Sequence, residues 1–194
     1  MNKPFQKIYF DPYLFFSLFL LSTLGLFFLF SASNADISIV SKQLVYIVVG
    51  LTIMIVVSQP DPDIFRRTSG LFLIFSLLLL GITYLIGPEI NGAQRWVRVG
   101  PFSFQSSELL KLAVPIFLAN FLFNKKLPIQ RKEIMISLLI ICCCFYFVFR
   151  QPDLGTALII AFSGLFVLFL SGLSLGFIGG SFVLLIISSP FIWN

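Results

Sequence analysis

Residues 91–100 and 104–111, NGAQRWVRVG and FQSSELLK, are polar stretches in a chain that apolar side chains otherwise dominate. Only 11% of the 194 residues are charged. Four of the charged residues fall within these two stretches: Arg95, Arg98, Glu108 and Lys111. The second stretch leads directly into a long apolar segment. Because ionisable side chains at the mouth of an apolar helix are costly in a membrane, they indicate a functional site.

The composition of the whole chain is that of a polytopic membrane protein. Hydrophobic residues make up 58% of it, phenylalanine alone occurs 25 times, and the mean hydropathy is +1.03, more apolar surface than a soluble domain can bury. The net charge of +5 does not indicate nucleic acid binding, because the cations lie between apolar runs. Histidine is absent, so proton transfer must fall to carboxylates, lysine or tyrosine. The three consecutive cysteines at 142–144 point in different directions on a helix, which excludes a metal site there.

Seven apolar runs follow one another along the chain. Each approaches the roughly 20 residues that a bilayer core demands once its polar flanks are counted. We predict transmembrane helices at residues 13–30, 44–57, 68–86, 108–123, 134–149, 157–170 and 177–193. The predicted fold class is an all-α polytopic transmembrane helix bundle in which residues 1–194 form a single integral membrane domain. An odd number of spans with no tail after Trp193-Asn194 favours a truncated chain.

The distribution of lysine and arginine predicts the orientation of these spans. With a cytoplasmic N-terminus, eight of these cations lie in inner loops: Lys3, Lys7, Arg66, Arg67, Lys125, Lys126, Arg131 and Lys132. Four lie in outer loops: Lys42, Arg95, Arg98 and Arg150. The positive-inside rule therefore places loops 87–107 and 150–156 together on the outer face. The first run, followed by Ser31-Ala32-Ser33, resembles a signal peptide, but its length and the spans after it favour a retained first span.

Glu108 and Lys111 are three residues apart, so on a helix they share a face and can form an ion pair. One interpretation is purely structural: the pair lets both charges enter the membrane. The other is functional, with Glu108 also favoured by the helix dipole in the first turn. Pro115 removes the helical partner of the Lys111 carbonyl, so we expect a kink that opens a wet pocket beside the pair.

Arg95, Arg98 and Asp153 each have a structural and a functional interpretation. Arginine suits bidentate binding of phosphate oxygens. Contact with lipid headgroups, with Trp96 as an interfacial anchor, is the alternative. Asp153 follows a proline and precedes an apolar run, a pattern typical of a helix N-cap, and capping does not exclude chemistry.

Three motifs together resemble the shape, elongation, division and sporulation (SEDS) family. They are Asn91–Trp96 (NGAQRW), the Phe-Gln-x-Ser-Glu-x-x-Lys run that ends at Lys111, and residues 151–156 (QPDLGT). The stretch LFVLFLSGLS at 165–174 adds to the resemblance, especially to members that act in rod-shape maintenance. One departure is Ser106, where the family pattern has proline, and serine leaves the entry to the following helix less rigid.

The resemblance implies a glycosyltransferase of the bacterial cytoplasmic membrane that polymerises lipid II into peptidoglycan strands during elongation. It implies ten spans, of which this chain carries about seven, and a main catalytic aspartate beyond Asn194, so the chain alone should be inactive. It also implies a class B penicillin-binding protein and other elongation-complex membrane proteins as partners.

Glycosyl transfer from a pyrophosphate-linked donor needs a carboxylate to accept a proton and cations to stabilise the leaving group. The candidate supporting catalytic residues are therefore Asp153 and Glu108. The candidate substrate-binding residues are Asn91, Arg95, Trp96, Arg98 and Lys111. A divalent cation is compatible with this chemistry, but no ligand set in the chain specifies one. A lipid II flippase and a non-catalytic scaffold for the penicillin-binding protein are the alternative functions.

Overall fold

The computed structural model describes residues 11–89, 94–99, 102–174, 176 and 179–180. Within them six α-helices and two β-strands follow in the order α1, α2, α3, β1, β2, α4, α5, α6. They form two compact units, Met1–Pro62 and Asp63–Asn194, and each is described by itself.

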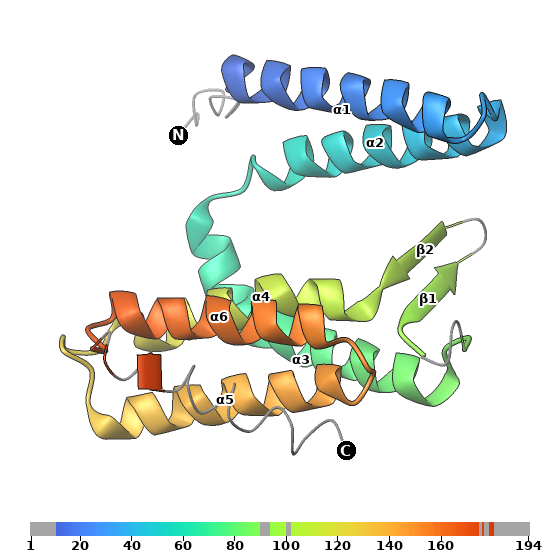
Figure 1. Cartoon of the computed structure of the whole chain (residues 1–194). Helices are drawn as coiled ribbons and strands as arrows, with labels where there is room; N and C mark the ends of the chain where they lie inside the picture. Colours follow the sequence, from blue (N-terminus) through green and yellow to red (C-terminus); the bar gives the residue numbers. More distant parts are fainter. Residues whose placement is uncertain (1–10, 90–93, 100–101, 175, 177–178, 181–194) are drawn as a thin grey trace, which may run out of the picture. The chain divides into compact units, whose positions relative to one another are not determined.

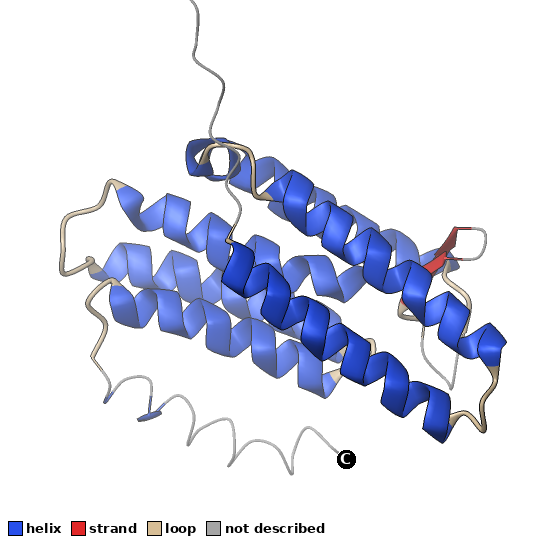
Figure 2. Cartoon of the chain, turned by 90° about the horizontal axis from the view of Figure 1, so that it is seen from above, coloured by secondary structure: helices blue, strands red, loops and turns tan. Residues whose placement is uncertain are grey.

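The first unit is a helical hairpin of α1 (Pro12–Ala32) and α2 (Ile37–Val57), whose helices lie side by side (Figures 1 and 2). An aspartate caps each start. Asp11 accepts hydrogen bonds from the Tyr13 and Leu14 amides at 2.9 and 3.1 Å, and Asp36 accepts one from the Ser38 amide at 2.8 Å. All described side chains of both helices are at least partly exposed, as expected of helices that face lipid.

The helix α2 begins at Ile37, seven positions before the predicted start at 44. The predicted start is wrong because Lys42, which the prediction places in an outer loop, lies inside the helix. In the structure, the cap at Asp36 fixes the start instead. Lysine near a helix end can extend its charged head away from apolar surroundings, so Lys42 does not interrupt the helix.

The second unit contains α3 (Pro62–Ile86), α4 (Ser106–Phe123), α5 (Arg131–Phe149) and α6 (Leu154–Leu170). Helix α6 packs against both α4 and α5, and α4 also contacts α5 (Figure 1). The largest fully buried apolar side chains come from these three helices: Leu110, Val114, Leu118, Val148, Ile160 and Leu168. This core brings the starts of α4 and α6 to the same end of the unit (Figure 1).

Helix α6 approaches α4 and α5 closely at Gly164. A Cβ atom there would lie 2.6 Å from the Cγ1 atom of Ile141 on α5 and 3.3 Å from Leu118 on α4. Only glycine avoids that overlap, so the position permits tight packing of the three helices.

A β-hairpin precedes α4. Strands β1 (Trp96–Val99) and β2 (Phe102–Gln105) pair antiparallel, with Trp96 opposite Gln105 and Arg98 opposite Ser103. We predicted a polar loop here, without strands. Four residues per strand are too few for the apolar alternation to stand out, although valine at 97 and 99 favours a strand.

The prediction of an all-α polytopic transmembrane fold is confirmed. Among the described residues, α1 to α5 are long and apolar enough to cross a membrane, while α6 is apolar but has 17 residues. The predicted seventh span, 177–193, lies almost entirely outside the described residues. The count of seven spans, the cytoplasmic N-terminus and the single domain over 1–194 stay predictions.

Candidate functional site

The hairpin and the turn that follows α5 are joined through Arg95. Its Nε atom donates to the carbonyl oxygen of Gln151, and one terminal nitrogen donates to that of Pro152, each at 2.6 Å. The Arg95 carbonyl in turn accepts a hydrogen bond from the Ser106 amide at 3.4 Å. The two polar motifs, more than fifty positions apart in the chain, therefore meet at one end of the helices.

Asp153 lies where these motifs meet. Its Oδ1 atom accepts a hydrogen bond from the Thr156 amide at 3.2 Å, so it caps α6 as its sequence context predicts. Its Oδ2 atom accepts a second hydrogen bond from Nε2 of Gln105, which also donates to Ser107 Oγ at 2.9 Å. Sequence reasoning missed the role of Gln105, and only its place inside the FQSSELLK motif could have indicated it.

The contact between Gln105 and Asp153 sets the starts of α4 and α6 beside each other. Ser106 and Ser107, the first residues of α4, are buried there. Free backbone N–H groups and the helix dipole give each helix start a partial positive charge. Two adjacent helix starts therefore favour a negatively charged group near this end, such as a carboxylate or a phosphate.

Glu108 and Lys111 form the ion pair that their spacing predicts. The Glu108 Oε2 and Lys111 Nζ atoms are 2.7 Å apart, and the side chains are 52% and 24% exposed, respectively. The carboxylate is therefore accessible, and the ammonium sits deeper along α4. The kink at Pro115 and the wet pocket beside this pair stay predictions.

The remaining predicted substrate-binding residues lie on or next to the hairpin. Trp96 and Arg98 are two positions apart on β1, so their side chains share one face of the strand. Trp96 is half-buried, and Arg98 is exposed. Asn91 lies outside the described residues.

Gln151 is a buried residue that the sequence analysis did not select. The residue is only 2% exposed. Its Nε2 atom donates a hydrogen bond to the Leu80 carbonyl oxygen of α3 at 3.3 Å. Its backbone carbonyl is one of the two acceptors of Arg95. Gln151 therefore attaches the turn that carries Asp153 to α3 as well as to the hairpin.

The part of the chain that the structure describes contains no cluster of side chains suited to bind a metal ion. There, no group of three or more His, Cys, Asp or Glu residues is placed to hold an ion. Of the three adjacent cysteines, Cys144 is buried and the other two are exposed.

Comparison with known proteins agrees with this architecture. The family model described as cell cycle protein, for FtsW, RodA and SpoVE, matches residues 12–194. The chain is 37% identical over 188 residues to the Escherichia coli (strain K12) protein named peptidoglycan glycosyltransferase MrdB, covering 97% of this chain and 51% of MrdB. It therefore spans about half the length of the curated relatives it matches.

Two solved structures share the fold. The crystal structure of Thermus thermophilus rod shape determining protein RodA has a TM-score of 0.81 at 28% identity, covering 93% of this chain and 60% of RodA. A chain from a structure titled for the coordination of polymerization and crosslinking by a peptidoglycan synthase complex has a TM-score of 0.84 at 28% identity, covering 96% of this chain and 55% of that one.

The fold and the site thus define a class of multi-helix membrane protein with a polar hairpin and a polar turn joined at one end. Within that class, the chain belongs to the FtsW, RodA and SpoVE family of cell cycle proteins.

Proposed function

We propose that the protein is a peptidoglycan glycosyltransferase of the bacterial cytoplasmic membrane, which polymerises lipid II into glycan strands during elongation and rod-shape maintenance. The observation that carries this proposal is the contact between the hairpin and the 150–156 turn. It gathers two carboxylates, Asp153 and Glu108, with the cations Arg95 and Lys111 at one end of the helices. The name of the relative MrdB supports the same activity.

The arrangement supplies parts of the chemistry that glycosyl transfer needs. A carboxylate accepts the proton of the attacking sugar hydroxyl, and the exposed Glu108 is accessible for that role. Positive charge stabilises the departing pyrophosphate, and Lys111 together with the two adjacent helix starts provides it. We assign supporting roles to Glu108 and Asp153, because the resemblance to the SEDS family implies a main catalytic aspartate beyond Asn194.

Arg95 has a positioning role in this proposal in addition to the predicted substrate contact. Two of its five N–H donors bind the carbonyls of Gln151 and Pro152. The donors that remain can meet phosphate oxygens. Arg98, exposed on β1, can add a second cation, and Trp96 on the same face of that strand offers an apolar surface.

A class B penicillin-binding protein is the partner we propose, together with other membrane proteins of an elongation complex. The support is the similarity to a chain from a structure titled for a peptidoglycan synthase complex that couples polymerization and crosslinking. The polymer made at one end of the helices would pass to the crosslinking partner on the same side of the membrane.

The placement of the charges favours an enzyme over a lipid II flippase. Alternating access works around a binding site near the bilayer midplane. The candidate residues instead meet at the end of the unit where α4 and α6 begin. A scaffold would need no such gathering of carboxylates and cations.

The test uses purified full-length protein with its penicillin-binding partner, labelled lipid II and detergent. Glycan polymer should form although no membrane separates two compartments. Glu108→Gln and Lys111→Met should each reduce polymer while the complex still assembles. Transport of lipid II in vesicles without any polymer from the intact complex would support the flippase instead. A complex that assembles but neither polymerises nor transports lipid II would support the scaffold, and full polymerisation by both variants would contradict the roles of Glu108 and Lys111.

A further inference from the structure

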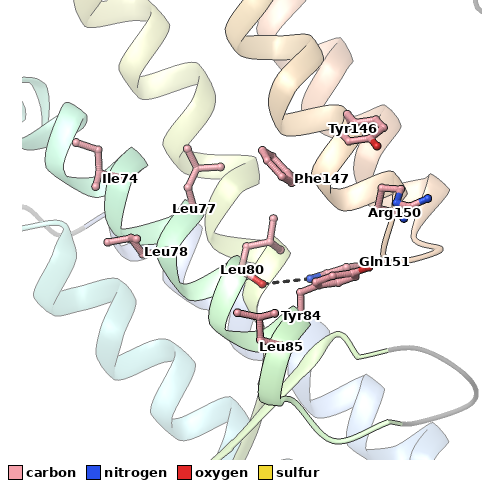
Figure 3. A pocket seen from close by; sticks show the side chains of 11 residues that line it. Ile74, Leu77, Leu78, Leu80, Tyr84, Leu85, Tyr146, Phe147, Arg150 and Gln151 are labelled. Carbon is pink, nitrogen blue, oxygen red and sulfur yellow. Dashed lines mark hydrogen bonds between the residues drawn. The ribbon is translucent and has the colours of Figure 1, made fainter.

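A cavity of about 590 Å³ lies between α3 and the end of α5 (Figure 3). On one side, its described lining consists of α3 residues between Ile74 and Leu85. On the other side, it consists of residues between Tyr146 and Gln151, at the end of α5 and in the turn that follows. It is therefore built from elements other than those that carry Glu108 and Lys111. The 150–153 turn is the point where the cavity and the candidate site adjoin.

The walls of this cavity are apolar and open toward the side of the helices. Leu78, Leu85 and Phe147 line it and are 62%, 76% and 50% exposed. Gly81 widens it, because a Cβ atom there would meet nothing within 4 Å. In a membrane such a surface meets hydrocarbon, so the cavity fits an extended apolar chain.

One end of the cavity is polar. The exposed side chain of Arg150 lies there beside Tyr84 and Gln151 (Figure 3). The Oε1 atom of Gln151 is buried and accepts no hydrogen bond from the residues that the structure describes. A buried acceptor without a partner is costly, and the costs fall when a ligand donor satisfies it.

The length of the cavity suits a lipid of a single leaflet. At 1.5 Å of rise per residue, the stretch from Ile74 to Leu85 is about 16 Å long. That is about half of the roughly 30 Å hydrocarbon core of a bilayer. An acyl chain anchored by a phosphate at Arg150 would end near the bilayer midplane, where the cavity ends.

We propose that this cavity binds a phospholipid of the surrounding bilayer. One acyl chain lies along α3, and the phosphate pairs with Arg150. A headgroup hydroxyl or amine donates to Gln151 when the headgroup carries one. The backbone of Gln151 is held by Arg95, so the bound lipid steadies the turn that positions Asp153.

The test uses the full-length protein in nanodiscs that contain phosphatidylglycerol with a photoactivatable diazirine in the middle of one acyl chain. After illumination, mass spectrometry should map adducts to α3 between Ile74 and Leu85. Gly81→Trp fills the cavity and should remove most of these adducts. The matched control is Ile82→Trp, an exposed position of the same helix outside the described lining, and it should leave the yield unchanged.

A second arm tests the phosphate contact without filling the cavity. Arg150→Gln should lower the yield from the phosphatidylglycerol probe about fivefold, a loss of nearly 1 kcal/mol. It should not change the yield from a diacylglycerol probe, which lacks the phosphate. An unchanged yield from the phosphatidylglycerol probe in the variant, or an equal fall in the yields from both probes, would overturn the proposal. Displacement of the probe by a polyprenyl phosphate at a low molar ratio would also overturn it. So would the finding that another part of the full-length protein fills the cavity and keeps lipid out.

Discussion

Gln105 donates a hydrogen bond to Oδ2 of Asp153, while Oδ1 of the same carboxylate caps α6 through the Thr156 amide. Both oxygens are thus used before any substrate arrives. Asp153 is held in one orientation from two directions, by the end of β2 and by the first turn of α6. A carboxylate held in this way can act as a fixed charge with little reorganisation.

Two substitutions at Asp153 separate capping from chemistry. Asn retains the cap but removes the charge, so Asp153→Asn should melt close to the parent protein and lose at least about tenfold in polymerisation, or 1.4 kcal/mol. Asp153→Ala should lose the activity and also about 1 kcal/mol of stability. Thermal melting and lipid II polymerisation of the full-length protein check both. An active Asn variant would show that capping is the whole role of this residue.

Arg95→Lys should behave as a severe substitution. Lysine offers a single ammonium group and cannot bind two carbonyls with the planar fork of arginine. We expect a loss of about 1–3 kcal/mol in stability, because the Gln151 and Pro152 carbonyls lose a charged donor. Polymerisation should fall with it. Ser103→Ala on β2, exposed and outside the site, is the matched control, and equal melting of both variants would contradict the bidentate role.

Charge reversal separates the two interpretations of the Glu108–Lys111 pair. If the pair only lets two charges enter the membrane, Glu108→Lys combined with Lys111→Glu should restore what either single change removes. We expect the double variant to stay inactive at normal expression, because Lys111 acts on pyrophosphate and Glu108 on a proton. Rod-shape complementation in depleted cells, with protein levels measured alongside, distinguishes the outcomes.

The orientation can be tested by thiol labelling. In a background where Cys142, Cys143 and Cys144 are alanine, cysteine at Ser103 should react with an impermeant reagent applied outside. Cysteine at Lys126 should react only after permeabilisation. Both positions are exposed, whereas Gln151 is buried and unsuited to a label. The reverse pattern would mean that the hairpin faces the cytoplasm.

The sequence was sufficient for the existence of the described helices, though not for all of their starts, and for local pairs. Apolar runs predicted the spans, the spacing of Glu108 and Lys111 predicted an ion pair, and Pro152 before Asp153 predicted a cap. These features depend on periodicity and on neighbours within one helical turn. They can be derived without knowing which helices touch.

The contacts between distant segments could not be predicted in the same way. The sequence around Arg95 does not show that it binds the carbonyls of Gln151 and Pro152. Every residue has a backbone carbonyl, so the residue types do not reveal which carbonyls accept a hydrogen bond. Gln105 and Gln151 are uncharged and common in loops, so their roles depend on tertiary placement. The start of α2 was missed for a related reason: a lysine inside a membrane helix looks like a boundary.

The two hydrogen bonds from Arg95 to the 150–156 turn also limit the order in which the parts of the site can form. A ribosome delivers Arg95 long before it delivers Gln151 and Pro152, and α4 and α5 must be inserted between these events. Until then the guanidinium must form hydrogen bonds with water or with another acceptor. The hydrogen bonds of Arg95 can form only after α5 is complete and the chain has turned at Gln151 and Pro152, so the two motifs meet late in synthesis.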